Sequence, residues 1–346
     1  MPHLVAAPDK FRGTATAPEI AQGAATGARR AGWTASCVPL ADGGEGTLDA
    51  VGGEVRTDVV TGPLGRPVEA QWRLVRAGSP PVATAVVEMS RASGLVLAGG
   101  AARNDPIGAT TRGTGELVRA ALRAGADRVV VGCGGSATTD GGAGALEALA
   151  GDPALRGVEL LVATDVTTPF LDAARVFAPQ KGASAEQVAL LTERLAATAR
   201  RYAAEMGVDV TRLDGAGAAG GLAGGLAALG GRIVSGFELV AELVGLDEQL
   251  ARADLVVTGE GCLDSTSLAG KVVSGVLSRL AGRAPALVVV GVSRSLLAAD
   301  LAAATAVPEH LVEVVDLTER FGAERALADP VALVADVVHD ALARLS

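Results

Sequence analysis

Aromatic residues are scarce in this 346-residue chain, which has five Phe, two Trp and one Tyr. Proteins that bind single-stranded nucleic acids stack the bases on aromatic side chains, and eight are too few for such a surface. The formal net charge of −9 also opposes binding to a phosphate backbone. We therefore expect no nucleic-acid partner.

Long apolar runs and paired cysteines are also missing. No stretch approaches 18 uncharged apolar residues, so we expect no membrane span. The segment Pro8-Asp9-Lys10 interrupts the N-terminus before the apolar core of a signal peptide could form. Three cysteines without CxxC spacing argue against a disulfide framework or a zinc cluster. These features predict a protein of the reducing cytoplasm with no membrane partner.

Lysine is equally rare, with three residues against 27 arginines. Each lysine lies in a glycine-containing stretch: Lys10 in APDKFRG, Lys181 in APQKGAS and Lys271 in SLAGKVVSG. A position that keeps lysine against such a bias favours a need for a compact ammonium group. Ammonium groups beside glycine amides bind phosphates. The three histidines lie outside these stretches, so any acid–base chemistry falls to carboxylates or lysines.

One pattern recurs along the chain: a short Val/Leu/Ala run, then a Gly/Asp-rich turn, then a stretch with helical spacing. Examples are RVVVG followed by CGGSATTDGG, and DLVVTG followed by EGCLDS. This alternation predicts parallel sheets with helices on both faces. In such sheets ligands bind outside the carboxyl ends of the strands. Residues 55–89 instead predict a meander of strands, and residues 214–231, with eight glycines, a helix packed closely against a neighbour.

The Gly/Asp turns carry many carboxylates. They are Asp9, Asp42, Glu45, Asp140, Asp165, Glu260 and Asp264. Any one of them could simply cap a helix, but five turns that each pair an acid with glycines favour a shared chemical role. Hard oxygen ligands suit Mg²⁺ with a nucleotide phosphate chain, and a positioned Asp can accept the proton of an attacking hydroxyl. We therefore expect phosphoryl transfer as the reaction type.

The usual nucleotide motifs fit poorly. A Walker A loop is ruled out because Ser265 and Val272 replace the required Gly and Ser/Thr around Gly270-Lys271. The segment GCGGSA at 132–137 matches a dinucleotide fingerprint, but the acid that should end the next strand does not fall at the right spacing. A nicotinamide-dependent oxidoreductase and a non-catalytic nucleotide- or acid-binding protein remain as alternatives.

Ten segments occur in the order seen in one family. They are APDKFRG, VPLADGGEGT, GPLGRPV, VEMSRASGL, RNDPIGATTRGTGEL, GCGGSATTDGGAG, ATDVTTPF, FAPQKGAS, GAGAAGG and TGEGCLDSTSLAGK. Together they resemble the bacterial class I glycerate kinases. The resemblance implies ATP- and Mg²⁺-dependent phosphorylation of D-glycerate, usually at the 2-hydroxyl, giving 2-phosphoglycerate.

The resemblance also implies the fold: two three-layer α/β domains with largely parallel sheets and an active-site cleft between them. We expect residues 1–55 with 250–346 to form a discontinuous Rossmann-like domain. Residues 56–249 would form an inserted α/β domain with a mixed sheet. The sequence leaves open whether the protein forms a homo-oligomer.

The same resemblance suggests the site residues. Asp9, Lys10, Asp42 and Asp165 would be catalytic, with Asp42 or Asp165 as the base. The substrate- and phosphate-binding residues would be Arg12, Gly43, Gly44, Glu45, Gly134, Gly135, Ser136, Lys181 and Lys271. Asp140, Glu260 and Asp264 would hold Mg²⁺. The carboxylate of glycerate calls for an arginine fork, for which Arg66, Arg103 and Arg112 are candidates.

One departure leaves the acceptor open. Only ALEALAGDPALRGVELLV separates GGAG from ATDV, whereas relatives carry a longer segment there. If that segment shapes the acceptor pocket, the substrate could be another small hydroxy acid.

Overall fold

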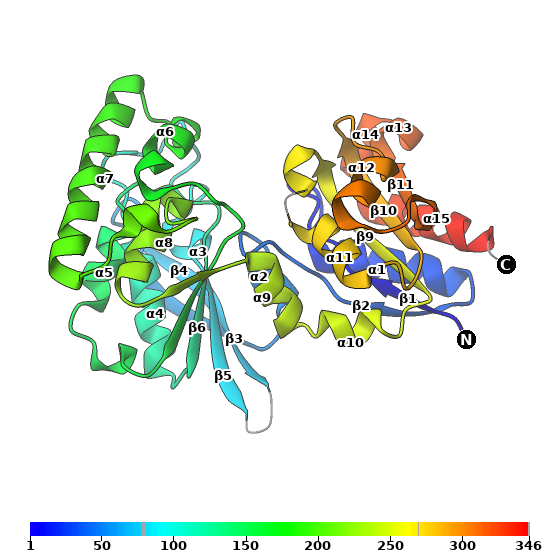
Figure 1. The fold of residues 1–346 in the computed structure, drawn as a ribbon, viewed down its shortest axis with the longest axis horizontal. Helices are drawn as coiled ribbons and strands as arrows, with labels where there is room; N and C mark the ends of the chain where they lie inside the picture. Colours follow the sequence, from blue (N-terminus) through cyan, green and yellow to red (C-terminus); the bar gives the residue numbers. More distant parts are fainter. Residues whose placement is uncertain (78–80, 269, 345–346) are drawn as a thin grey trace. The chain divides into compact units, whose positions relative to one another are not determined.

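The chain forms two compact units in the computed structural model, which describes residues 1–77, 81–268 and 270–344 (Figure 1). Unit 1 comprises Met1–Asp42, Asp49–Val51 and Phe237–Ser346, and unit 2 comprises Gly43–Leu48 and Gly52–Gly236. The sequence placed the divisions at 55/56 and 249/250. The expected domains also include residues 78–80, 269 and 345–346, which lie outside the described residues.

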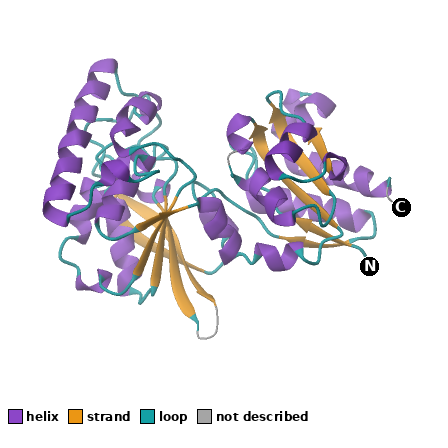
Figure 2. Ribbon diagram, in the orientation of Figure 1, coloured by secondary structure: helices purple, strands orange, loops and turns teal. Residues whose placement is uncertain are grey.

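Unit 1 is built on a five-stranded sheet in which every pairing is parallel, in the order β11-β10-β9-β1-β2. The strands are β1 (His3–Ala6), β2 (Thr34–Cys37), β9 (Leu255–Leu263), β10 (Ala286–Ser293) and β11 (Val312–Asp316). Neighbouring residues Leu4 and Val5 are both fully buried, although successive side chains of a strand point to opposite faces. Both faces of the sheet are therefore covered by helices, as Figure 2 shows.

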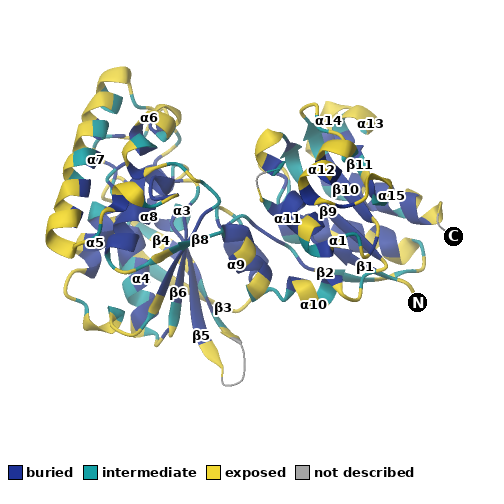
Figure 3. Cartoon of the chain, in the orientation of Figure 1, coloured by how far each residue is buried: buried dark blue, intermediate teal, exposed yellow. Residues whose placement is uncertain are grey.

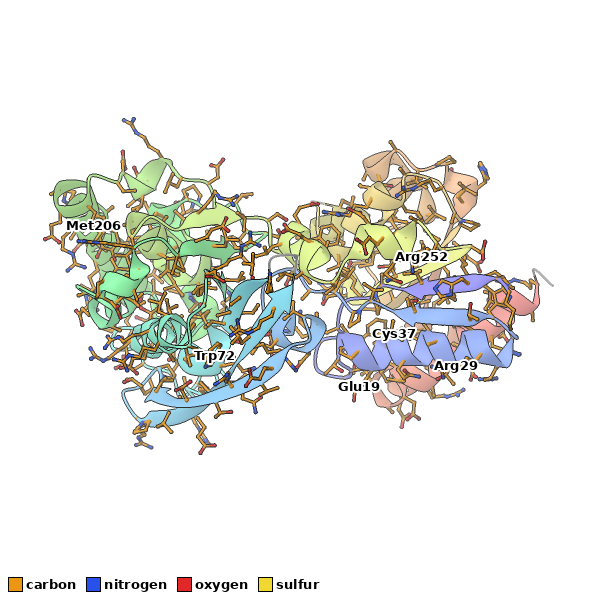
Figure 4. The ribbon with its side chains drawn as sticks, turned by 90° about the horizontal axis from the view of Figure 1, so that it is seen from below. Glu19, Arg29, Cys37, Trp72, Met206 and Arg252 are labelled. Atoms are coloured by element: carbon orange, nitrogen blue, oxygen red, sulfur yellow. The ribbon has the colours of Figure 1, made fainter. Side chains whose placement is uncertain are left out.

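Helices α1 (Ala17–Arg30) and α15 (Pro330–Ala343) pack against each other on one face of this sheet. Their close approach requires glycine, because a Cβ on Gly27 would lie 2.3 Å from the carbonyl oxygen of Ala335. Thr16 and Glu19 form a capping box at the start of α1, and Arg29 lies in its last turn (Figure 4). The remaining helices of this unit are α9 (Gly236–Leu243), α10 (Leu246–Leu250), α11 (Val272–Leu280), α12 (Ala298–Thr305), α13 (Leu317–Phe321) and α14 (Ala323–Ala328).

Unit 2 contains a six-stranded mixed sheet in the order β3-β4-β5-β6-β7-β8. The strands are β3 (Glu54–Thr61), β4 (Pro67–Ala77), β5 (Val82–Glu88), β6 (Arg128–Gly132), β7 (Glu159–Ala163) and β8 (Arg232–Val234). The first three form the antiparallel meander predicted for residues 55–89, and the others pair in parallel. The predicted α/β class with largely parallel sheets is confirmed.

The apolar core of this sheet is shared with α4 (Arg112–Arg123), α5 (Ala143–Leu149) and α8 (Ala218–Ala228), and with Ala92 of the short helix α3 (Ser90–Ser93). The indole of Trp72 on β4 belongs to this core (Figure 4). Helices α6 (Ala173–Phe177) and α7 (Ala185–Met206) build a second core with Phe170, and α7 exposes much of its length to solvent (Figure 3). The short helix α2 (Thr47–Ala50) has residues in both units.

The glycine-rich helix α8 packs tightly against its neighbours, as the sequence predicts. A Cβ on Gly224 would lie 2.4 Å from Cδ2 of Phe170, and one on Gly225 would lie 2.7 Å from the carbonyl oxygen of Gly141. Across the described residues, no helix is long and apolar enough to cross a membrane.

Candidate active site

The predicted site residues of unit 1 gather at the carboxyl ends of β1 and β9. The amide of Asp9 donates to the carbonyl oxygen of Gly259 at 2.9 Å, which continues the pairing of the two strands into the loop. Gly261 then passes so close to this loop that a Cβ would lie 3.0 Å from the amide nitrogen of Arg12. Residues 8–12 therefore run along the end of β9, where Glu260 lies.

Asp9 is a buried carboxylate, with 9% of the residue exposed. Its pKa is raised to about 6, mainly by burial; the charge of Lys10 opposes this rise and the charge of Asp42 adds to it. The Nζ atom of Lys10 lies 3.5 Å from Oδ1 of Asp9, and the Lys10 amide donates to the same oxygen at 2.7 Å. Lys10 thus faces Asp9, which interacts electrostatically with Asp42 and Glu260; we call these three carboxylates the acidic cluster (Asp9, Asp42 and Glu260).

Glu260 is the least satisfied member of the acidic cluster. Its pKa is raised to about 7, mainly by burial; a hydrogen bond from Ser267 opposes this rise and the charge of Asp9 adds to it. Its Oε1 atom is buried and lacks a hydrogen-bond partner in the part of the chain that the structure describes. A buried oxygen without a donor is costly, and a bound cation would satisfy it. The acidic cluster therefore fits Mg²⁺.

No group of three or more His, Cys, Asp or Glu side chains is arranged to hold a metal ion among residues 1–77, 81–268 and 270–344. This does not conflict with a Mg²⁺ site, because Mg²⁺ is usually held by one or two carboxylates together with substrate phosphates and waters. Asp9 and Glu260 supply two such carboxylates.

Asp264 and Lys271 are joined through one threonine. Oδ1 of Asp264 accepts hydrogen bonds from the amide and the hydroxyl of Thr266, at 2.9 and 2.7 Å, and these bonds lower the pKa of Asp264. Nζ of Lys271 lies 3.2 Å from the same hydroxyl. Lys271 directly precedes α11, so its ammonium group lies at a turn that follows β9. Arg12, the last predicted residue of this unit, is exposed.

The predicted glycines of unit 2 meet at the carboxyl ends of β6 and β7. A Cβ on Gly43 would lie 2.7 Å from Cα of Gly236, and one on Gly134 would lie 2.6 Å from Cα of Gly44. Gly43 also has a φ of +79°, a conformation that side chains disfavour. These positions require glycine because the backbones touch. Glu45, in the same loop, is exposed.

Lys181 holds the loop that contains the GCGGSA motif. Its Nζ donates to Oγ of Ser136 and to the carbonyl oxygen of Thr138, both at 2.7 Å. The residue is only 3% exposed. Burial lowers its pKa to about 7, and the charge of Asp140 opposes this shift. Lys181 thus fixes the hydroxyl of Ser136. The predicted contact of Lys181 with phosphate stays a prediction.

Asp140 has a full set of protein partners. Its carboxylate accepts hydrogen bonds from the amide and hydroxyl of Thr111 and from the amides of Gly142 and Gly144, at 2.8–3.2 Å. These bonds tie the start of α4 to the start of α5. The metal role predicted for Asp140 stays a prediction, but four donors from the chain itself argue against it.

Asp165 follows β7, and its Oδ1 accepts hydrogen bonds from Oγ of Ser235 and from the amide of Gly236, both at 2.8 Å. These two donors fix the orientation of the carboxylate. A predicted base therefore lies at the same sheet edge as Gly43 and Gly134.

Sequence reasoning missed Glu88, a carboxylate that is 1% exposed at the end of β5. Its Oε1 accepts from the amide of Leu48 at 2.8 Å, and its Oε2 lies 3.2 Å from Nε of Arg91 and 3.4 Å from Oγ of Ser90. The signal was present, since VEMSR places an acid at the end of a buried run. Its lack of a neighbouring glycine kept it out of the Gly/Asp turns.

The structure thus brings the predicted residues into two groups. Asp9, Lys10, Arg12, Asp42, Glu260, Asp264 and Lys271 belong to unit 1. Gly43, Gly44, Glu45, Gly134, Gly135, Ser136, Asp140, Asp165 and Lys181 belong to unit 2.

Comparison with known proteins identifies the family. The model of the "Glycerate kinase family" matches residues 4–152 and 150–345. The chain is 40% identical over 311 residues to a glycerate 2-kinase of Escherichia coli, covering 79% of this chain and 80% of that protein. It is 38% identical over 331 residues to a glycerate kinase of Bacillus subtilis, covering 85% of each.

A solved structure extends the likeness to the fold. The crystal structure of a candidate glycerate kinase 2 from Salmonella typhimurium LT2 is similar with a TM-score of 0.80 at 32% identity. The match covers 99% of this chain and 98% of that one. The chain therefore belongs to the glycerate kinase family.

Proposed function

We propose that this protein transfers the γ-phosphoryl group of ATP to the 2-hydroxyl of D-glycerate, giving 2-phosphoglycerate and ADP. The observation that carries the proposal is the buried Oε1 of Glu260 beside Asp9, at the ends of two parallel strands; this oxygen has no hydrogen-bond partner among the described residues. Two crowded carboxylates with raised pKa values are suited to a divalent cation that accompanies a nucleotide. Family membership and the name of the Escherichia coli relative support the acceptor and the position.

In this mechanism Asp9 and Glu260 would hold Mg²⁺, which neutralises the charge of the phosphate chain when bound. Lys10 and Lys271 would contact phosphate oxygens with their ammonium groups. The backbone amides of Gly43, Gly44, Gly134 and Gly135 would bind further oxygens. Arg12, Glu45 and Ser136 complete the predicted binding residues, and Asp264 orders the turn before Lys271 through Thr266.

The chemical step requires one proton acceptor. The 2-hydroxyl oxygen of glycerate forms a bond to the γ-phosphorus, and the bond from that phosphorus to the bridging oxygen of ADP breaks. The hydroxyl proton passes to a carboxylate, which we propose to be Asp165 or Asp42. Asp165 is favoured by its fixed orientation, because Ser235 and Gly236 both donate to one of its oxygens.

The three free cysteines fit a reducing cytoplasm, where ATP is available.

Release of ADP by the purified protein tests the proposal. The assay uses ATP and Mg²⁺ with D-glycerate, L-glycerate or D-erythronate, and product analysis separates the 2- and 3-phosphates. Rapid turnover with D-glycerate to the 2-phosphate is expected. Turnover with D-erythronate alone would instead assign a longer acid as the acceptor, and the absence of turnover with all three would contradict the proposed activity.

A further inference from the structure

Arg91 is a candidate for a binding role that none of the sequence motifs had assigned. It lies in α3, which begins two residues after β5 ends, at the carboxyl end of the parallel pair β5–β6. Ligands of α/β sheets bind at such ends. The three arginines chosen from the sequence are placed differently: Arg112 pairs with Glu116 within α4, and Arg66 and Arg103 are exposed in turns.

The surroundings of Arg91 are the loops that the sequence had singled out. A Cβ on Gly135 would lie 3.2 Å from Cβ of Ser90, and the amide of Ala137 donates to the carbonyl oxygen of Ser93. The start and end of α3 are therefore packed on the loop that contains Gly134, Gly135 and Ser136.

A buried carboxylate orients the Arg91 side chain. Nε of Arg91 lies 3.2 Å from Oε2 of Glu88, whose other oxygen accepts from the amide of Leu48. Since Glu88 is 1% exposed, its charge must be paired, and this pairing restrains the guanidinium group. The Arg91 side chain is nevertheless 41% exposed, so that a small ligand can reach it from solvent.

We infer that Arg91 binds the carboxylate of the acceptor acid and so selects a 2-hydroxy acid over a neutral polyol; this inference rests on the proposed function. A planar guanidinium group matches a carboxylate with two parallel hydrogen bonds. Glu88 positions Arg91 and also holds the loop of Gly43 and Gly44 through Leu48. One buried residue thereby links carboxylate binding to the glycine loop.

The experiment compares wild type, Arg91→Gln and Arg91→Lys with D-glycerate and with its neutral amide, D-glyceramide. Hydrogen bonds to charged groups correspond to about 10- to 100-fold in binding. We expect Arg91→Gln to raise KM for D-glycerate by about that factor while KM for ATP changes less than about 3-fold. In Arg91→Gln, the preference for D-glycerate over D-glyceramide that wild type shows should disappear.

Arg91→Lys guards against loss of folding, because it keeps a cation next to Glu88. It should fold normally yet bind D-glycerate more weakly than wild type, since an ammonium group lacks the planar fork. The matched control is Arg128→Gln, which removes an arginine whose Nε pairs with Glu159 at 2.7 Å at the amino end of β6. This control should keep wild-type kinetics.

Calorimetric titration of D-glycerate without ATP separates the inference from the proposed function. If wild type turns over D-glycerate and both Arg91 variants bind it as tightly as wild type does, the inference is wrong and the proposed function stands. An equal rise in KM for the acid and the amide would also overturn it. If wild type neither binds nor phosphorylates D-glycerate, the proposed function fails and the inference with it.

Discussion

The ammonium group of Lys181 donates to Oγ of Ser136 at 2.7 Å, although the two residues are 45 positions apart in the chain. The same group donates to the carbonyl oxygen of Thr138. A buried cation that holds a glycine-rich loop has two consequences: it fixes the hydroxyl of Ser136, and it makes the stability of unit 2 depend on pH.

The first prediction concerns this pH dependence. Burial lowers the pKa of Lys181 from 10.5 to about 7. Between those values the unfolded chain binds more protons at this position than the native chain, so the free energy of unfolding rises with pH from about 7 toward 10.5. Lys181→Met should remove this rise.

Urea unfolding at pH 7, 8 and 9 measures the effect, with Lys271→Met as a control that removes a partly exposed lysine. We expect the difference between Lys181→Met and wild type to change steadily over these three pH values. A constant difference would show that Lys181 does not titrate in the native protein.

The same loop shows how far the sequence could predict the site. A strand followed by an acidic turn was enough to single out Asp165, because the carboxyl ends of parallel strands lie at one edge of a sheet. Gly134 and Ser136 were selected through the resemblance to the glycerate kinases. The backbone contact of Gly134 with Gly44 was not predictable, since it joins segments distant in sequence. Asp140 shows another limit. The sequence pattern of an acid in such a turn is the same whether its carboxylate caps a helix or binds a metal ion.

The α/β fold was predictable from the pattern of apolar residues along the chain. Short apolar runs that end at glycine became buried parallel strands such as β6 and β9. Arg91 was not selected from the sequence, because its inferred role depends on the contact with Glu88, and the burial of that carboxylate cannot be recognised from the residue type alone.

The second prediction concerns Glu260. Its pKa is raised from 4.5 to about 7, chiefly by burial. Between those values the native chain binds more protons at this position than the unfolded chain, so this residue lowers the free energy of unfolding as the pH rises from about 4.5 to 7. Glu260→Gln should therefore melt at a higher temperature than wild type at pH 8, and the two should differ less at pH 4.5.

Melting curves with EDTA and with added Mg²⁺ test whether Glu260 takes part in Mg²⁺ binding, without an activity assay. Mg²⁺ should raise the melting temperature of wild type, because a ligand that binds only the native state stabilises it. The increase should be much smaller for Glu260→Gln. Asp140→Asn serves as the comparison, since the carboxylate of Asp140 is already occupied by four donors, and its response to Mg²⁺ should match that of wild type.

The third prediction identifies the base. Asp165→Asn keeps an oxygen that can accept from Ser235 and Gly236, so the fold at this position should be retained. Loss of a general base lowers turnover by about 10²- to 10⁴-fold. We expect a loss of that size in kcat for Asp165→Asn or for Asp42→Asn, with circular dichroism unchanged. Near-normal rates in both variants would place the base elsewhere.

The fourth prediction tests the close approach of the two glycine loops. In Gly134→Ala the new Cβ would lie 2.6 Å from Cα of Gly44 and 3.2 Å from the amide nitrogen of Glu45. These are backbone atoms, so the loop of Gly43 and Gly44 must shift. Such crowding costs about 1–3 kcal/mol of stability, and the displaced amides should also lower kcat/KM for D-glycerate by at least about 10-fold.

Gly231→Ala is the matched control, because its Cβ would lie 2.8 Å from the carbonyl oxygen of Leu226, at the end of α8 and away from the glycine loops. Both variants should lose stability in urea, but only Gly134→Ala should lose activity at a temperature where each is folded. If the two variants lose activity in proportion to stability, the contact between Gly134 and Gly44 supports the fold alone. A selective loss in Gly134→Ala would mean that the backbone of residues 43–45 must keep its position for phosphoryl transfer.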